Sequence, residues 1–236
     1  MLPGIAAGAT HGVIRVGHAV RALLDEETGP RVDELGQGLA YWAARWQPLA
    51  PAGRGPYPSA DPRSALDLVP RVPDQRFGIR NRLAQLADLP GWERAAAAVP
   101  GAATGPVRER LEGIVAAAVL RHRTHGYGNP VMLVHAATAP AAVLRTLPTL
   151  PPDLHGPSLA AAWVAAAAVT AAYSPATPAG REVPAPGSPA EVMRRAADDG
   201  DAHAIKFADA AVEAYGVTGD PELLDAADHA TVLISS

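Results

Sequence analysis

Apolar residues recur at intervals of three and four positions along most of the chain, which is the spacing that buries one face of a helix. No segment alternates polar and apolar residues cleanly enough to indicate a strand. The pattern therefore predicts helices over residues 2–24, 31–46, 75–87, 107–123, 130–137, 140–146 and 158–173. The last of these is rich in alanine and is expected at the centre of the fold, because almost none of its side chains favours water.

Three further helices are indicated by the residues that begin them. Ser188 is followed by a proline and, three positions on, by Glu191, which is a capping box with proline in the first turn. That helix should end near Gly200, after which Asp201 can cap a helix that runs to about residue 215. The sequence Gly-Asp-Pro-Glu that starts at Gly219 begins the last helix by the same logic.

The chain is therefore predicted to be all-α, with residues 1–236 forming a single multi-helix domain. Alanine dominates its apolar residues and is the best helix former, so Ala-rich central helices can pack closely. The stretches 48–58 and 174–187 are rich in proline and glycine and are expected to be loops.

Composition narrows the classes of function. A net charge of −4 gives no reason to expect a nucleic acid partner, and the absence of cysteine excludes disulfides and thiolate chemistry. The most apolar run, residues 159–173, is too short to cross a bilayer, and the chain does not begin with the charged and apolar regions of a signal peptide. We therefore expect a cytoplasmic protein with no membrane partner. The sequence also contains no Gly-rich nucleotide fingerprint, no P-loop, no nucleophile elbow and no HExxH motif.

Histidine spacing is the main chemical signal among the eight histidines. His11 and His18 lie seven residues apart, about two helical turns, so they share a helix face. His135 lies in an apolar stretch, where an imidazole costs free energy unless it finds a partner. Four other histidines are interpreted as surface or capping residues: His122, His125, His155 and His229.

A single lysine is the second signal. Lys206 is the only lysine among 20 basic residues, so a role that arginine cannot fill would explain its presence. His203 lies three residues before it, on the same helix face. Asp199, four residues before His203, is positioned to orient that imidazole if the helix extends far enough back.

Four segments, taken in order, resemble the questin oxidase-like family across nearly the whole chain. The first runs from Thr10-His-Gly-Val through residue 23 and continues at 39–43; the second is 131–144, the third 201–210, and the weakest 215–221. The family includes fungal enzymes that oxidise and open aromatic polyketide rings. At least part of it is understood to use O2 and a non-haem iron held by histidines and a carboxylated lysine.

Carried over position by position, the resemblance implies that His11, His135, His203 and Lys206 bind Fe(II), with carboxylation of the lysine. It places Arg15 and His18 in the wall of the substrate pocket. Family members also have an upstream motif of the Asn-His-x-Pro-Met type that supplies another histidine. This sequence has no counterpart, so it resembles an N-terminally shortened member whose metal site is one ligand short.

The resemblance leaves three functions open. The first is an iron-dependent oxygenase that acts on a polycyclic aromatic substrate with O2. The second is an NADPH-dependent Baeyer–Villiger-type monooxygenase without a metal, although no nucleotide-binding motif is present. The third is a catalytically inactive helical protein that binds a small molecule.

Overall fold

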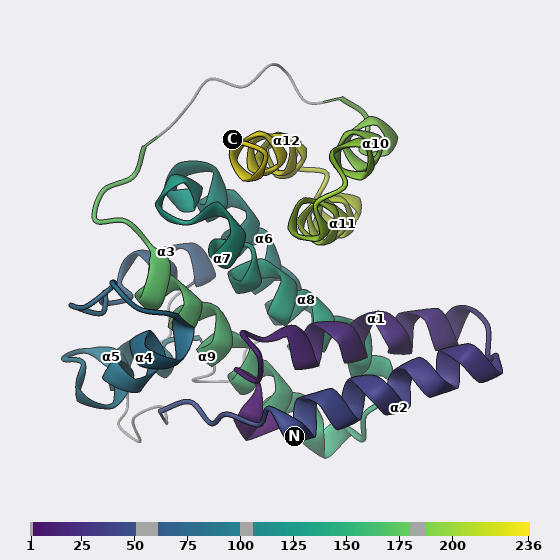
Figure 1. Cartoon of the computed structure of the whole chain (residues 1–236), viewed down its shortest axis with the longest axis horizontal. Coiled ribbons are helices and arrows are strands. Elements are labelled where there is room, and N and C mark those ends of the chain that lie inside the picture. Colours follow the sequence, from purple (N-terminus) through teal and green to yellow (C-terminus); the bar gives the residue numbers. More distant parts are fainter. Residues whose placement is uncertain (1, 51–60, 100–105, 180–186) are drawn as a thin grey trace.

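A computed structural model describes residues 2–50, 61–99, 106–179 and 187–236 (Figure 1). The first half of the chain forms α1 (His11–Asp25), α2 (Gly29–Ala44), α3 (Pro62–Asp67), α4 (Ile79–Ala84), α5 (Trp92–Ala96) and α6 (Val107–His125). The second half forms α7 (Pro130–Leu133), α8 (His135–Thr146), α9 (His155–Tyr173), α10 (Pro189–Asp199), α11 (Ala202–Thr218) and α12 (Glu222–Ile234). Short 3₁₀ turns are η1 (Leu2–Gly4), η2 (Gln85–Asp88), η3 (Gly126–Gly128), η4 (Leu147–Thr149) and η5 (Pro152–Leu154).

The all-α prediction is confirmed: the described residues contain no strand, only an isolated bridge between Ile5 and Gln47. Helix α8 is central, because α1, α6, α9 and α11 all pack against it. In Figure 1, α1 and α2 form a projecting hairpin, whereas α10, α11 and α12 form a separate group, in which α11 and α12 pack on α6. One continuous set of buried apolar side chains joins these helices.

Helix α9 is apolar around nearly its whole circumference and lies deep in the core. Trp163 is fully buried, and its indole nitrogen donates a hydrogen bond of 2.9 Å to the carbonyl of Ala95. Two segments, Pro130–Thr149 and Pro152–Tyr173, are long and apolar enough to cross a membrane, but most of each is buried inside the fold. Such burial is typical of the core helices of a soluble protein.

Glycine allows α1 to approach its neighbours closely. A Cβ atom at Gly17 would lie 2.7 Å from the backbone Cα of Ala142 in α8, and one at Gly12 would lie 2.8 Å from the ring of Trp42 in α2. Such separations are well inside van der Waals contact, so any larger residue would push the helices apart. The indole of Trp42 is also tied to η1, since it donates a 2.8 Å hydrogen bond to the carbonyl of Gly4.

The cap predictions are confirmed for α10 and α11. Ser188 and Glu191 form the reciprocal capping box, and Gly200 ends α10 with φ of 84°. Asp201 caps α11 by accepting a 2.6 Å hydrogen bond from the backbone of His203. At the last helix the prediction is off by one residue: Pro221 is at the N-cap of α12, and the Asp220 side chain before it accepts a 3.0 Å bond from the backbone of Glu222. Parts of the two predicted loops, residues 51–58 and 180–186, lie outside the described residues.

The predicted helix over residues 2–24 was wrong at its start. A 3₁₀ turn and further turns occupy residues 2–10, and α1 begins only at His11. The backbone cannot continue as a right-handed helix there because Gly8, Ala9 and Thr10 have φ values of 55°, 59° and 68°.

Two other boundaries also differ from the predictions. The break expected between residues 137 and 140 lies at Val134, and Pro140 is inside α8. Pro140 lacks the N–H that would donate one helical hydrogen bond, but the helix continues on both sides of it. The helix predicted over 75–87 is limited to α4 and continues as η2, while Gln85 bonds back to the loop residue Asp74.

Candidate metal centre

Three imidazoles and one amine meet where α1, α8 and α11 come together. His11, His135 and His203 each direct one ring nitrogen to a common point, and these three atoms lie within 4.8 Å of one another. The Nε2 atoms of His11 and His135 are 3.0 Å apart. The Nζ atom of Lys206 lies 3.0 Å from Nε2 of His135 and 3.4 Å from Nε2 of His11. All four residues singled out as metal ligands in the sequence therefore converge.

The outward-facing nitrogen of each ring has its own partner. Nδ1 of His135 donates to the carbonyl of Met132 at 3.1 Å, which leaves the lone pair on Nε2. Nδ1 of His203 lies 3.0 Å from a carboxylate oxygen of Asp201, and the His11 ring is hydrogen-bonded to the backbone of Gly8. Metal-binding histidines are usually oriented by such partners, which fix the tautomer and the ring plane.

Burial and mutual repulsion keep the cluster from accumulating positive charge. Burial, followed by the nearby Lys206, lowers the pKa of His11, His203 and His135, most strongly for the fully buried His135. Asp201 opposes this effect at His203. Burial lowers the pKa of Lys206 to about 8, with a smaller opposing effect of Asp201. The imidazoles are therefore neutral with free lone pairs, and the lysine loses its proton more readily than a lysine in water.

The spacing of His11 and His135 fits two neighbouring ligands of a first-row metal ion. A tetrahedral or octahedral ion with bonds of about 2.0–2.1 Å holds neighbouring ligand atoms roughly 3.0–3.4 Å apart. The Nε2 atoms of His11 and His135 are 3.0 Å apart, and the donor atoms of all three histidines lie within 4.8 Å of one another. Imidazole nitrogens together with an oxygen ligand suit Fe(II), among other divalent ions.

Backbone strain precedes the first ligand. Ala9 and Thr10 are the residues other than glycine with positive φ in the described chain, and they lie directly before His11. Left-handed conformations cost roughly 1–2 kcal/mol for a residue with a side chain. Strain of this kind concentrates at functional sites, where the surrounding structure holds it in place. Here it turns the chain sharply into α1 and presents His11 at the first position of that helix.

A cavity of about 620 Å³ adjoins the cluster, and His11 forms part of its wall. Tyr41 and Trp46 supply aromatic surface, while Arg45 and Arg80 supply positive charge. The guanidinium of Arg45 lies over the Tyr41 ring, 5.2 Å from its centre. Its volume is in the usual range for small-molecule sites and is large enough for a ligand of several fused rings.

Arg15 and His18 lie away from the four converging residues and do not line this cavity. Arg15 is bound through two nitrogens to Glu34 of α2, at 2.5 and 2.8 Å. His18 lies between Arg21 and Arg145, two turns along α1 from His11. The partner expected for His203 also differs: Asp199 accepts from Asp201 and Ser235, and Asp201 contacts the imidazole instead. The helix does not extend back to Asp199, because Gly200 separates α10 from α11.

The interpretation of His122, His125 and His229 as surface histidines was wrong. They are 2%, 9% and 4% exposed. His122 packs on the ring of Phe207 and bonds through Nε2 to the carbonyl of Pro130 at 3.0 Å. Arg121 and Arg123, which flank His122, are neutralised by carboxylates of α3 and α12, which lets this end of α6 be covered.

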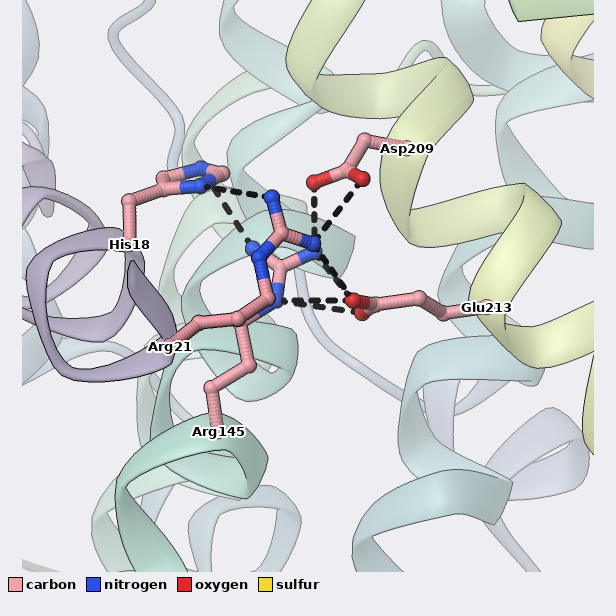
Figure 2. Close-up of polar contacts among 5 residues, drawn as sticks. All are labelled: His18, Arg21, Arg145, Asp209 and Glu213. Atoms are coloured by element: carbon pink, nitrogen blue, oxygen red, sulfur yellow. Dashed lines mark hydrogen bonds and ion pairs between the residues drawn. The ribbon is translucent and has the colours of Figure 1, made fainter. Parts of the chain in front are cut away.

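Sequence reasoning missed a second polar cluster, on the same three helices. We call it the distal ion cluster, and Figure 2 shows its members: His18, Arg21, Arg145, Asp209 and Glu213. Arg145 is 6% exposed along its side chain. Arg145 lies about three turns along α8 from His135, the nearest predicted ligand, and gave no local signal, although Asp209 and Glu213 share one helix face and could have suggested a basic partner.

Together the geometry defines a class: an all-helical protein with a candidate three-histidine, one-lysine metal centre beside an aromatic-lined cavity. No protein-family model, curated protein or solved structure matches the chain.

Proposed function

We propose that this protein is a metal-dependent oxidoreductase, and specifically a non-haem Fe(II) oxygenase that acts on a polycyclic aromatic substrate with O2. The observation that carries the proposal is the convergence of His11, His135, His203 and Lys206 from three helices, each imidazole with a partner behind it. A chance meeting of four desolvated basic groups would be costly, because each gives up solvation without gaining an opposite charge.

Lys206 fits the proposal through its chemistry. Its free amine can attack the carbon of CO2 and release one proton, which forms a carbamate with two oxygen atoms. The product is an anion where a cation stood, so it supplies an oxygen ligand and offsets the charge of a divalent ion. Arginine cannot form this group, since its guanidinium stays protonated. The single lysine of the chain lies at the position where the distinction matters.

Bound Fe(II) would supply a redox-active centre at which O2 and an electron-rich phenolic ring can react. The protein's own residues orient the partners and exclude water. His135 is fully buried and closes the inner side of the site, while His11 connects it to the cavity. Arg45 and Arg80 favour a substrate that carries phenolate or carboxylate oxygens at that cavity. A reducing cytoplasm, which keeps iron as Fe(II), is the compartment that suits this chemistry.

Two alternatives make different predictions. An NADPH-dependent monooxygenase without metal needs a nucleotide site, and would consume NADPH and O2 as a metal-free protein. A catalytically inactive binding protein would retain ligand in the 620 Å³ cavity without consuming O2. The four-residue convergence favours the metal-dependent function over both, because neither alternative needs three aligned imidazoles.

Metal content of protein purified anaerobically, without a chelator or a His-tag, tests the proposal first. We expect nearly one iron per chain, and loss of that iron in Lys206→Ala and His203→Ala. The matched control is His155→Ala, which removes a partly buried histidine that, among the described residues, bonds to the Leu150 carbonyl. Iron-dependent O2 uptake with phenolic polycycles would support the oxygenase. Protein that remains empty after Fe(II) addition would overturn the metal proposal.

A further inference from the structure

The distal ion cluster joins the three helices that carry the candidate ligands. His18 and Arg21 belong to α1, Arg145 to α8, and Asp209 and Glu213 to α11 (Figure 2). The candidate ligands lie in the first two turns of the same helices. At 1.5 Å per residue, His18 is about 10 Å along α1 from His11, and Glu213 is about 10 Å along α11 from Lys206.

Arg145 is the centre of the cluster. Its Nη2 atom lies 2.7 Å from a carboxylate oxygen of Asp209 and 2.7 Å from one of Glu213. Its Nε atom also contacts Glu213, at 3.1 Å, and its Nη1 atom lies 3.3 Å from Nε2 of His18. A guanidinium with its donors in a rigid fork fixes the direction of all three partners at once.

Arg21 adds the link between α1 and α11. Its Nη1 atom lies 3.0 Å from Asp209 and 2.6 Å from Glu213. Helix α1 packs extensively on α8, whereas α11 packs mainly on α6, α10 and α12. Among the described residues, α1 and α11 share little direct interface, so these ion pairs are a principal constraint on their relative position.

The charges within the cluster balance. Two arginines face two carboxylates, and burial together with Arg145 lowers the pKa of His18 to about 4, so this imidazole is neutral at pH 7. A neutral ring can accept a hydrogen bond from one arginine at one nitrogen without adding charge. The Arg145 side chain is 6% exposed, so the loss of a carboxylate partner would leave a buried, unpaired cation. The helices would then have to move to let water reach it.

We propose that the distal ion cluster is a positioning site, which holds α1, α8 and α11 in the register that brings the candidate metal ligands together. This inference rests on the proposed metal-binding function of the site. The cluster touches neither metal nor substrate, and it acts by fixing helices whose opposite ends carry the ligands.

Glu213→Gln tests the proposal with little change in shape. The control is Asp228→Asn, which breaks an ion pair with Arg195 at 2.5 Å between α10 and α12, helices that carry no candidate ligand. Both variants should lower thermal stability. Only Glu213→Gln should weaken Co(II) binding, by about tenfold as for other residues that orient metal ligands, and alter the visible absorption bands that report Co(II) geometry.

Arg21→Lys is a milder second variant if Glu213→Gln does not fold. Its single amine keeps the charge but cannot reach two carboxylates and a ring together. Unchanged Co(II) affinity and bands in a folded cluster variant would overturn the proposal and reduce the cluster to general stabilisation.

The metal-free protein supplies an independent readout. Long-range 1H–15N spectra report the tautomer and hydrogen bonding of each imidazole, and the His11 and His135 signals should shift in the cluster variant and stay fixed in Asp228→Asn. If wild-type protein binds no metal, the proposed function fails and these spectra alone decide the inference: shifted signals support it and fixed signals overturn it.

Discussion

Gly17→Ala is the sharpest test of how tightly the fold draws its candidate ligands together. Gly17 lies in α1 two turns before its end, and an added methyl would lie 2.7 Å from Cα and Cβ of Ala142 and 2.8 Å from its carbonyl oxygen. Ordinary carbon–carbon contact begins near 3.5 Å, so α1 and α8 must separate by roughly 1 Å. The obstacle is backbone, which cannot rotate aside as a flexible side chain can.

Two free energies compete in this variant. Replacing glycine by alanine inside a helix favours folding by about 1 kcal/mol. Overpacking a close helix interface costs about 1–3 kcal/mol. We therefore expect net destabilisation of about 1 kcal/mol, with Tm lower by about 2–4 °C for each kcal/mol lost. The Nε2 atoms of His11 and His135, now 3.0 Å apart, should also separate, and metal affinity should fall.

Gly36→Ala is the matched control. Gly36 lies in the middle of α2, and a Cβ atom there meets nothing within 4 Å. This variant should gain about 1 kcal/mol from helix propensity alone. Urea unfolding followed by circular dichroism measures both changes, and Co(II) titration measures the affinity. If Gly17→Ala is as stable as Gly36→Ala and binds Co(II) as wild type does, the reasoning about the α1–α8 contact is refuted.

Three further predictions concern single side chains. Metal affinity, measured by titration at fixed bicarbonate, should rise with pH through about 8. Below that value, which is the pKa of Lys206, the amine holds a proton that competes with the metal. A metal affinity that does not change with pH would contradict this competition. Acid should destabilise the fold as pH falls from 6.5 toward 4, since burial lowers the pKa of His122 to about 4 and the unfolded chain then binds the extra proton. Urea unfolding at several pH values measures how steeply the free energy of unfolding changes with pH. That slope should be smaller in His122→Gln by up to about 1.4 kcal/mol per pH unit, and an equal slope would show that His122 is not the group responsible. Asp201→Ala should lose about 1 kcal/mol of helix capping and also weaken Co(II) binding at least several-fold, because one carboxylate oxygen caps α11 and contacts His203; unchanged binding would remove its orienting role.

Features with local causes were predictable from the sequence. The capping box at Ser188 and the Asp201 cap depend on residues within four positions, and both are present. The four converging residues were also singled out, but on the chemistry of a single lysine and on a family resemblance. That α1, α8 and α11 bring them together follows from packing between segments more than 60 residues apart, which periodicity cannot encode.

Where sequence reasoning failed, tertiary packing overrode a local expectation. His122 was expected at the surface, yet its neighbours Arg121 and Arg123 pair with Asp67 and Asp225, so the helix end is covered. Arg145 was missed for a related reason: its partners lie on another helix about 65 residues away. A buried arginine can be predicted only together with the carboxylates that pair with it, and the fold alone brings these groups together.

The proposed role of Lys206 resolves a difficulty of the metal-free site. Three neutral imidazoles with inward lone pairs would leave acceptors unsatisfied in a desolvated space. The amine of Lys206 supplies donors to Nε2 of His11 and His135, at 3.4 and 3.0 Å, so these two acceptors are satisfied before any ion binds. Loss of a proton and addition of CO2 would convert this donor into an anionic oxygen ligand at the same place. One side chain can thus stabilise both states of the site, which a guanidinium, fixed as a cation, could not.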